Sequence, residues 1–137
     1  MLRPGSRNIG MDKTALVATD FTIGTKLVGA LDESDLSIRV ALWASLSEYE
    51  NWRFVLSSPR LDDAGPLAGY RLVNDTLDAA GFSTESLPSL LILKMSDPFI
   101  RSLRRMFAKS KSVEGMRLGG QLIGDRFVED GLAYRVR

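Results

Sequence analysis

Residues Ile38 to Ser47 read IRVALWASLS, and the order of residue types in this stretch decides how the surrounding chain can fold. Ile, Val, Leu, Ala and Leu stand at every second position, with Arg, Ala, Trp and Ser between them. This period of two predicts a β-strand rather than the helix that the alanine and leucine content alone would suggest. A second apolar stretch, Trp52 to Ser57, follows after the polar residues 48–51. The two stretches together predict a β-hairpin.

Three helices are predicted around these strands. Apolar residues recur with helical spacing over residues 20–34, 66–80 and 97–109. The second and third of these ranges place a proline at the first helical position, where its missing N–H costs no hydrogen bond. Gly81 follows the second helix as a left-handed stop.

The segment SSPRLDDAGP, Ser57 to Pro66, joins the second strand to the second helix. We interpret it as a strand end, a turn and a helix cap. One of the carboxylates of Asp62 and Asp63 caps the helix opened by Pro66, and both stabilise its positive end. Arg60 is then the one member of the segment with no evident structural role.

Two further features complete the predicted sheet. Residues 89–95 have a short apolar centre typical of a strand that is buried on both faces, in the middle of a sheet. Residues 116–136 lack helical periodicity, and Gly124-Asp125 predicts the tight turn of a terminal hairpin. Asp130-Gly131 predicts either a second turn or a bulge. The order α-β-β-α-β-α-β-β predicts an α+β fold: a mixed, mostly antiparallel sheet of about five strands with three helices.

The 137 residues are the size of one domain. Residues 1–10 contain Pro, Gly, Ser and Asn without a period, so we expect a flexible arm there and a single domain over residues 11–137. Eighteen basic and 17 acidic residues give a net charge of +1, so nucleic acid or an anionic membrane would need a local patch to bind. No long apolar stretch and no cysteine are present, so we expect a cytoplasmic protein without membrane contact.

The composition also restricts catalysis. The sequence has no histidine and no cysteine, which removes the commonest general base, the usual zinc ligands and thiol chemistry. The acidic pairs Asp62-Asp63 and Glu129-Asp130 have the ligand type that Mg²⁺ prefers, and a metal-dependent hydrolase is one hypothesis. Capping and turn formation explain both pairs better. We therefore predict no catalytic residue, no metal site and no cofactor.

The most concentrated charge follows Asp97, with no further acid before Glu114. It comprises the five cations Arg101, Arg104, Arg105, Lys109 and Lys111. The first four have helical spacing and form a stripe that can meet phosphates. The alternative, which we favour at this point, is an ordinary solvated helix face whose cations complement the helix dipole.

The aromatic residues suggest a third kind of site. Trp43 lies on the strand face opposite Val40 and Leu42, and Trp52 is expected to pair with it across the hairpin. Such a second apolar face needs a cover, either the chain's own helices or a partner protein. If a partner covers it, Trp43, Trp52 and Arg60 are its candidate contacts, because Trp and Arg are common interface anchors.

A set of single residues and short motifs in this sequence is similar to a set found in a known family. They are Trp43 with Ala41-Leu42, Trp52-Arg53, Ser58-Pro59, Gly65-Pro66, Tyr70, Asp97-Pro98, Glu129-Asp130 and Tyr134-Arg135. In this set the chain, from Met11 to its end, resembles a family of short bacterial proteins whose function is not established. The resemblance implies a bacterial, cytoplasmic, single-domain protein and carries no catalytic residue with it.

From the sequence we expect a non-enzymatic protein-interaction or accessory domain, which binds a protein partner or itself. The first alternative is nucleic-acid binding through the basic helix 97–109. The second is the metal-dependent hydrolase with its acidic pairs.

Overall fold

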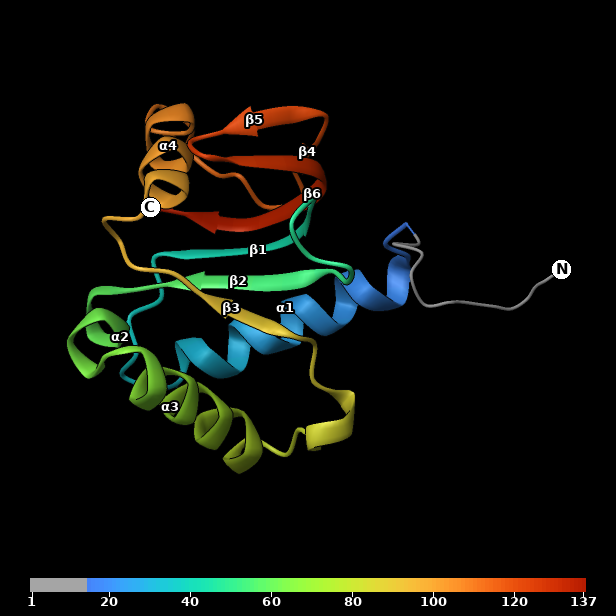
Figure 1. Cartoon of the computed structure of the whole chain (residues 1–137). Helices are drawn as coiled ribbons and strands as arrows, with labels where there is room; N and C mark the ends of the chain where they lie inside the picture. Colours follow the sequence, from blue (N-terminus) through green and yellow to red (C-terminus); the bar gives the residue numbers. More distant parts are fainter. Residues whose placement is uncertain (1–14) are drawn as a thin grey trace, which may run out of the picture.

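The computed structural model describes residues 15–137, which form a mixed β-sheet with helices on both faces (Figure 1). This confirms the predicted α+β class. The predicted arm, residues 1–10, lies outside the described residues. Between residues 15 and 137, no helix has the length and apolar character that crossing a membrane requires.

The elements are α1 Ala18–Asp32, β1 Val40–Leu46, β2 Arg53–Ser57, α2 Pro59–Ala64, α3 Pro66–Ala79, a 3-10 turn Thr84–Ser86, β3 Leu90–Ile92, α4 Pro98–Met106, β4 Arg117–Leu118, β5 Gln121–Ile123 and β6 Arg126–Val136. The order matches the prediction, with one helix, α2, and one strand, β4, added within the described part of the chain. All three predicted helices keep their places as α1, α3 and α4, but α4 ends at Met106, three residues before Lys109.

β1 lies at the centre of the sheet. The strand order is β3-β2-β1-β6-β4, and β5 also pairs with β6. The predicted hairpin is confirmed, because β1 and β2 are antiparallel with Trp43 opposite Phe54. Among the described strands only the β2–β3 pair is parallel, so the sheet is mixed and mostly antiparallel.

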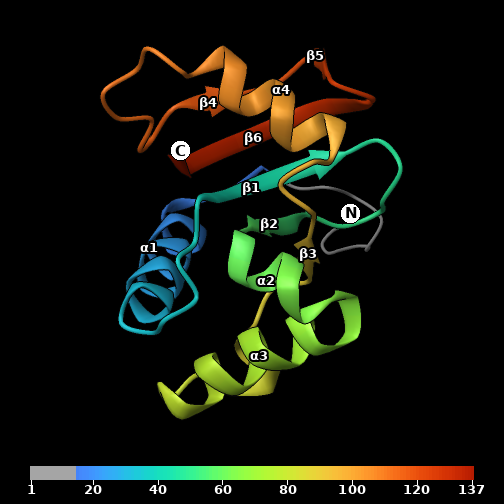
Figure 2. The ribbon, with the colours of Figure 1, turned by 90° about the vertical axis from the view of Figure 1, so that its left-hand side faces the viewer.

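Alternate residues of β1 point to opposite faces, which divides the core into two layers. Val40 and Leu42 face α4, whereas Ala41 and Trp43 face α1, α2 and α3. Figure 2 shows α4 above the sheet and α2 and α3 below it. The helices fill the layers with Phe99, Ile100 and Leu103 on one side and Leu27, Leu31, Leu61, Val73 and Leu77 on the other. Because both faces are covered, all seven residues of β1 are buried.

The structure corrects the place of the predicted strand 89–95. β3 has only three residues and lies at the edge of the sheet, parallel to β2, rather than in its middle. Its apolar side chains are covered because helices pack on both faces, Leu91 facing one core layer and Leu90 the other. The Ile92 amide donates a hydrogen bond to the Tyr70 hydroxyl of α3 at 3.0 Å. Burial on both faces therefore comes from helix packing and not from a central position.

The segment 57–66 contains a helix where a turn was predicted. Ser58 caps α2, because its hydroxyl accepts a hydrogen bond from the Leu61 amide at 3.0 Å. α3 begins at Pro66 after Gly65, whose φ of 87° ends α2, and no side chain caps it. The predicted capping role of Asp62 is thus wrong: its carboxylate accepts the Met95 N–H at 3.1 and 3.3 Å. Ser58-Pro59 is itself a cap followed by proline, and it starts a helix seven residues earlier than the predicted one.

The terminal hairpin is confirmed at Gly124-Asp125, where Gly124 has a φ of 62° and Ile123 pairs with Arg126. β6 continues straight through Asp130 and Gly131, so the alternative of a second turn is wrong. The register between β1 and β6 shifts at Glu129, which makes it the extra residue of a β-bulge.

Candidate functional site

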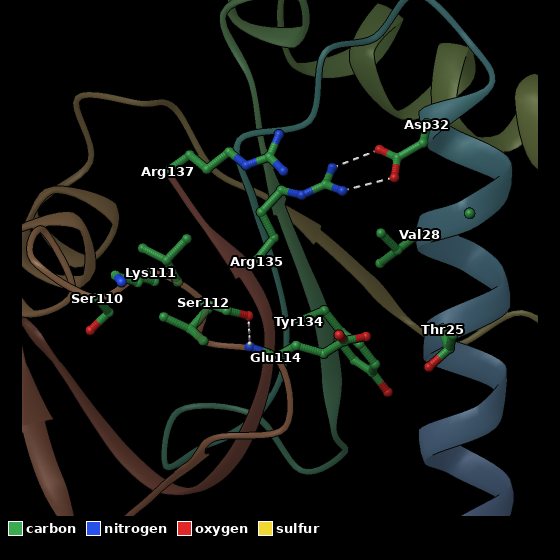
Figure 3. A pocket seen from close by; sticks show the side chains of 13 residues that line it. Thr25, Val28, Asp32, Ser110, Lys111, Ser112, Glu114, Tyr134, Arg135 and Arg137 are labelled. Carbon is green, nitrogen blue, oxygen red and sulfur yellow. Dashed lines mark hydrogen bonds and ion pairs between the residues drawn. The ribbon is translucent and has the colours of Figure 1, made fainter.

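A groove lies where the C-terminal end of β6 passes between α1 and the loop that follows α4 (Figure 3). Its volume is about 360 Å³. We call it the α1–β6 groove; it is lined by Thr25, Val28, Gly29 and Asp32 of α1, by residues 110–114, and by residues 134–137. Sequence analysis pointed to Lys111 alone among these residues.

One face of α1 forms a wall of the groove. Thr25, Gly29 and Asp32 are four and then three residues apart, which places them on one side of a helix along about 10 Å. Gly24 lets the helix approach β6 closely, because a Cβ there would overlap the Tyr134 hydroxyl. That hydroxyl donates to the Phe21 carbonyl at 2.9 Å and closes the floor. A Cβ at Gly29 would meet no atom within 4 Å, so this glycine leaves open space.

An ion pair joins α1 to β6 at one end of the groove. The Arg135 guanidinium donates to both carboxylate oxygens of Asp32, at 2.6 and 2.8 Å, and to the Ile38 carbonyl at 3.3 Å. These hydrogen bonds, together with the charges of Arg135 and Arg137, hold the pKa of the Asp32 carboxyl below its usual value. The same bonds raise the pKa of Arg135. Both groups are charged at neutral pH.

Two of the predicted basic residues, Arg104 and Lys111, lie next to this end of β6 or line the groove. Arg104 of α4 donates from Nε to the Arg137 carbonyl at 2.7 Å, which fixes α4 against the end of β6. Lys109 and Lys111 follow α4 in the loop and are not on its helical stripe. We call Arg101, Arg104, Arg105, Lys109, Lys111 and Arg137 the basic surface; all six are exposed. A second hollow of about 290 Å³ adds Arg39 beside Arg135 and Arg137.

None of the six basic-surface side chains forms an ion pair with any residue from 15 to 137. In contrast, Arg117, Arg126 and Arg135 each lie within ion-pair distance of a carboxylate. No ion pair with an acid of residues 15–137 therefore neutralises the basic surface, although the charge of Arg137 acts on the Asp32 carboxylate. An anionic ligand is the partner that such a surface suits.

The three candidate partner contacts do not come together. Trp43 is 5% exposed, and its indole N–H donates to the Asp20 carbonyl at 3.2 Å under α1. Its ring stands edge-on to Phe54 at 5.1 Å, so the predicted pair with Trp52 is replaced by Trp43 and Phe54, which are opposite in the strand register. Trp52 is half-buried just before β2, and Arg60 is exposed on α2.

The acidic pairs are also apart. Asp62 binds the Met95 amide, while Glu129 accepts from the Ser45 hydroxyl at 3.0 Å and Asp130 pairs with Arg117 at 2.8 Å. Residues 15–137 contain no group of three or more acidic residues placed to hold a metal ion. The structure gives the hydrolase hypothesis no assembled site.

Comparison with protein-family models, with curated proteins and with solved structures found no match to this chain. Sequence reasoning missed Asp32, Glu114, Arg135 and Arg137. The sequence does contain one indication of this groove. Arg135 and Arg137 are two residues apart at the end of a predicted strand, so their side chains are expected on the same face of the sheet.

Proposed function

We propose that this chain is a nucleic-acid-binding domain that holds phosphates on the basic surface. The observation that carries the proposal is the hydrogen bond from Arg104 to the Arg137 carbonyl, which brings the cations of α4 next to the last arginine after β6. Arginine donates well-oriented hydrogen bonds to phosphate oxygens, and lysine adds a point charge. A chain with a net charge of only +1 thereby presents a strongly cationic area on one side.

The binding is expected to be mainly electrostatic. None of the six side chains is an aromatic group that stacks on bases, so contact is with the phosphate backbone and carries little sequence information. Each neutralised phosphate releases counterions, so affinity falls steeply with salt.

The test is fluorescence anisotropy with labelled single- and double-stranded oligonucleotides at several salt concentrations. The variant is Arg101→Glu with Arg105→Glu, which keeps the Arg104 hydrogen bond intact. The matched control is Arg60→Glu with Arg71→Glu, the same charge change at exposed positions of α2 and α3. We expect the variant to lose most binding and salt dependence, and the control to keep them. Equal binding by the two double variants, or no binding by the unaltered chain, would overturn the proposal.

We propose in addition that the domain acts without catalysing a reaction, in a bacterial cytoplasm. The support is the resemblance of the sequence and its lack of histidine and cysteine. Turnover of a bound oligonucleotide during long incubation with Mg²⁺, abolished by Asp62→Asn, would contradict the non-catalytic part.

Self-association is the second candidate function, and one observation favours it. Leu122 and Phe127 are directly opposite across the β5–β6 hairpin, with 67% and 45% of their surface exposed. Adjacent exposed apolar residues are typical of a contact with a second copy. Light scattering is expected to show a dimer that Phe127→Lys converts to a monomer; a monomeric unaltered chain at high concentration would remove this candidate.

A further inference from the structure

We propose that the α1–β6 groove binds a nucleoside monophosphate, either free in solution or as the terminal nucleotide of a strand. The two sources share one chemistry: a phosphate monoester joined to a base. This assignment goes beyond the proposed nucleic-acid binding and does not depend on it, because a free nucleotide fills the groove without contacting α4.

The phosphate is assigned to the end of the groove near Asp32. Two guanidinium groups, those of Arg135 and Arg137, are found there with the single carboxylate of Asp32. The Arg135 guanidinium already donates to Asp32. The N–H groups of the Arg137 guanidinium are the ones that we assign to the ligand. Lys111 also lines the groove, from the loop that follows α4. The local excess of positive charge suits a dianionic phosphate.

The opposite end of the groove carries a negative charge. Glu114 extends its carboxylate across the groove in front of Tyr134, toward Thr25 (Figure 3). Within residues 15–137 this carboxylate accepts no hydrogen bond and forms no ion pair, while the Glu114 amide is bonded to the Ser112 hydroxyl. An acceptor of this kind matches the exocyclic amino group of a base.

Between its two ends the groove is open, and valine side chains supply its apolar lining. Val28 and Val136 line it and are half-buried, and Gly29 contributes no side chain. The ring of Tyr134 is buried with its hydroxyl already bonded, so a base packs against valine methyl groups rather than stacking on an aromatic ring. The volume of about 360 Å³ lies within the range of small-molecule sites.

The arrangement predicts a preference among bases. Adenine, cytosine and guanine carry an amino group that donates to Glu114. At the position where cytosine carries its amino group, uracil has a carbonyl oxygen, which the carboxylate repels. AMP and CMP are therefore expected to bind more tightly than UMP, and adenosine, which lacks the phosphate, is expected to bind weakly.

The first experiment titrates the full chain with AMP, CMP, UMP, adenosine and inorganic phosphate while amide resonances are followed by NMR. We expect AMP and CMP to shift Thr25, Gly29 and Glu114, with affinities roughly tenfold above those of UMP and adenosine. Shifts confined to α4, equal affinity for inorganic phosphate and AMP, or no shift at millimolar nucleotide would each overturn the assignment.

Variants separate this site from the basic surface. Gly29→Gln fills the open space and is expected to abolish nucleotide binding, whereas Gly29→Ala adds one methyl group and keeps most of it. Glu114→Gln is expected to remove the preference for AMP over UMP. Arg101→Glu with Arg105→Glu should leave AMP binding unchanged even where it abolishes oligonucleotide binding. If Gly29→Gln binds AMP as tightly as Gly29→Ala, the groove is not the site.

A last comparison identifies the source of the ligand. Oligonucleotides with a 5′-phosphate and with a 5′-hydroxyl are titrated against the Gly29→Ala and Gly29→Gln chains. A gain from the 5′-phosphate that only Gly29→Ala shows supports a strand terminus as the ligand. AMP binding without such a gain supports a free nucleotide.

Discussion

Asp32, the last residue of α1, and Arg135, near the end of β6, are joined by two hydrogen bonds of 2.6 and 2.8 Å. The two residues are far apart in sequence and belong to elements that pack side by side. Two parallel hydrogen bonds fix the plane of the guanidinium as well as its position. This pair therefore sets the spacing of one end of the α1–β6 groove.

The pH dependence of stability is expected to report this pair. In the folded chain the pKa of Asp32 lies below its usual value of 3.8, chiefly because Arg135 donates hydrogen bonds to it. The stabilisation is present above pH 3.8 and is lost as the pH falls through the lowered pKa. Since the Asp32 side chain is 43% exposed, the contribution is at most about 1 kcal/mol. Urea unfolding of Asp32→Asn should show a smaller loss of stability on acidification than the unaltered chain, with Asp75→Asn on α3 as the control. Identical acid profiles for Asp32→Asn and the unaltered chain would contradict this prediction.

The close approach of α1 to β6 is expected to make Gly24 intolerant of any side chain. A Cβ at this position overlaps the buried Tyr134 hydroxyl, so Gly24→Ala should destabilise by about 1–3 kcal/mol. Gly29→Ala, on the same helix but facing open space, should stabilise by about 0.5–1 kcal/mol, because alanine favours helix. Thermal unfolding of the two variants measures this. Partial rescue of Gly24→Ala by Tyr134→Phe supports the overlap as the cause, and equal effects of the two glycine variants would refute it.

The Tyr134 phenol is expected to lose its proton only at a higher pH than an ordinary tyrosine. Burial of its phenol raises its pKa from 10.0 to about 12. Because the folded pKa is the higher one, the unfolded chain loses this proton first, and stability falls as the pH rises from 10 toward 12. Ultraviolet titration should show one tyrosine ionising near pH 12, and Tyr134→Phe should remove that step. A titration unchanged by the substitution would show that another group is responsible.

The cap of α2 gives a prediction about the segment 57–66. Ser58→Ala removes the hydrogen bond to the Leu61 amide in a fully buried place and should cost about 1 kcal/mol. Asp63→Ala, which removes an exposed carboxylate that the sequence suggested as a cap, should change stability by less than about 0.5 kcal/mol. Denaturant unfolding of both variants decides between the two roles. A larger cost for Asp63→Ala than for Ser58→Ala would return the capping role to the acid.

Local patterns in the sequence predict local structure well here. The alternation from Ile38 to Leu46 and the Gly124-Asp125 turn depend on neighbouring residues alone, and both are found as expected. The place of β3 was not predictable in this way. Its apolar run is buried by α3 and α4, and the Tyr70 hydroxyl bonds its edge amide, which are contacts between distant segments.

For the candidate site, too, the features that depend on neighbouring residues were predictable and those that depend on distant segments were not. The cations of α4 and its loop form a visible cluster in the sequence, but their continuation to Arg137 depends on the Arg104 hydrogen bond. Asp32 and Glu114 are single acids in unremarkable surroundings. Asp32 and Glu114 lie at opposite ends of one groove only because α1 packs against β6, and Gly24 permits that packing.

The central place of β1 also has a consequence for how the chain is made. β1 receives its first neighbour, β2, after a few residues, but its second neighbour, β6, is synthesised after all the other described strands. Until then the nascent chain carries a mostly apolar strand with one free edge, which is a form of backbone prone to pair with other chains. Pairing with β6 is therefore the step that covers the second edge of β1 during synthesis.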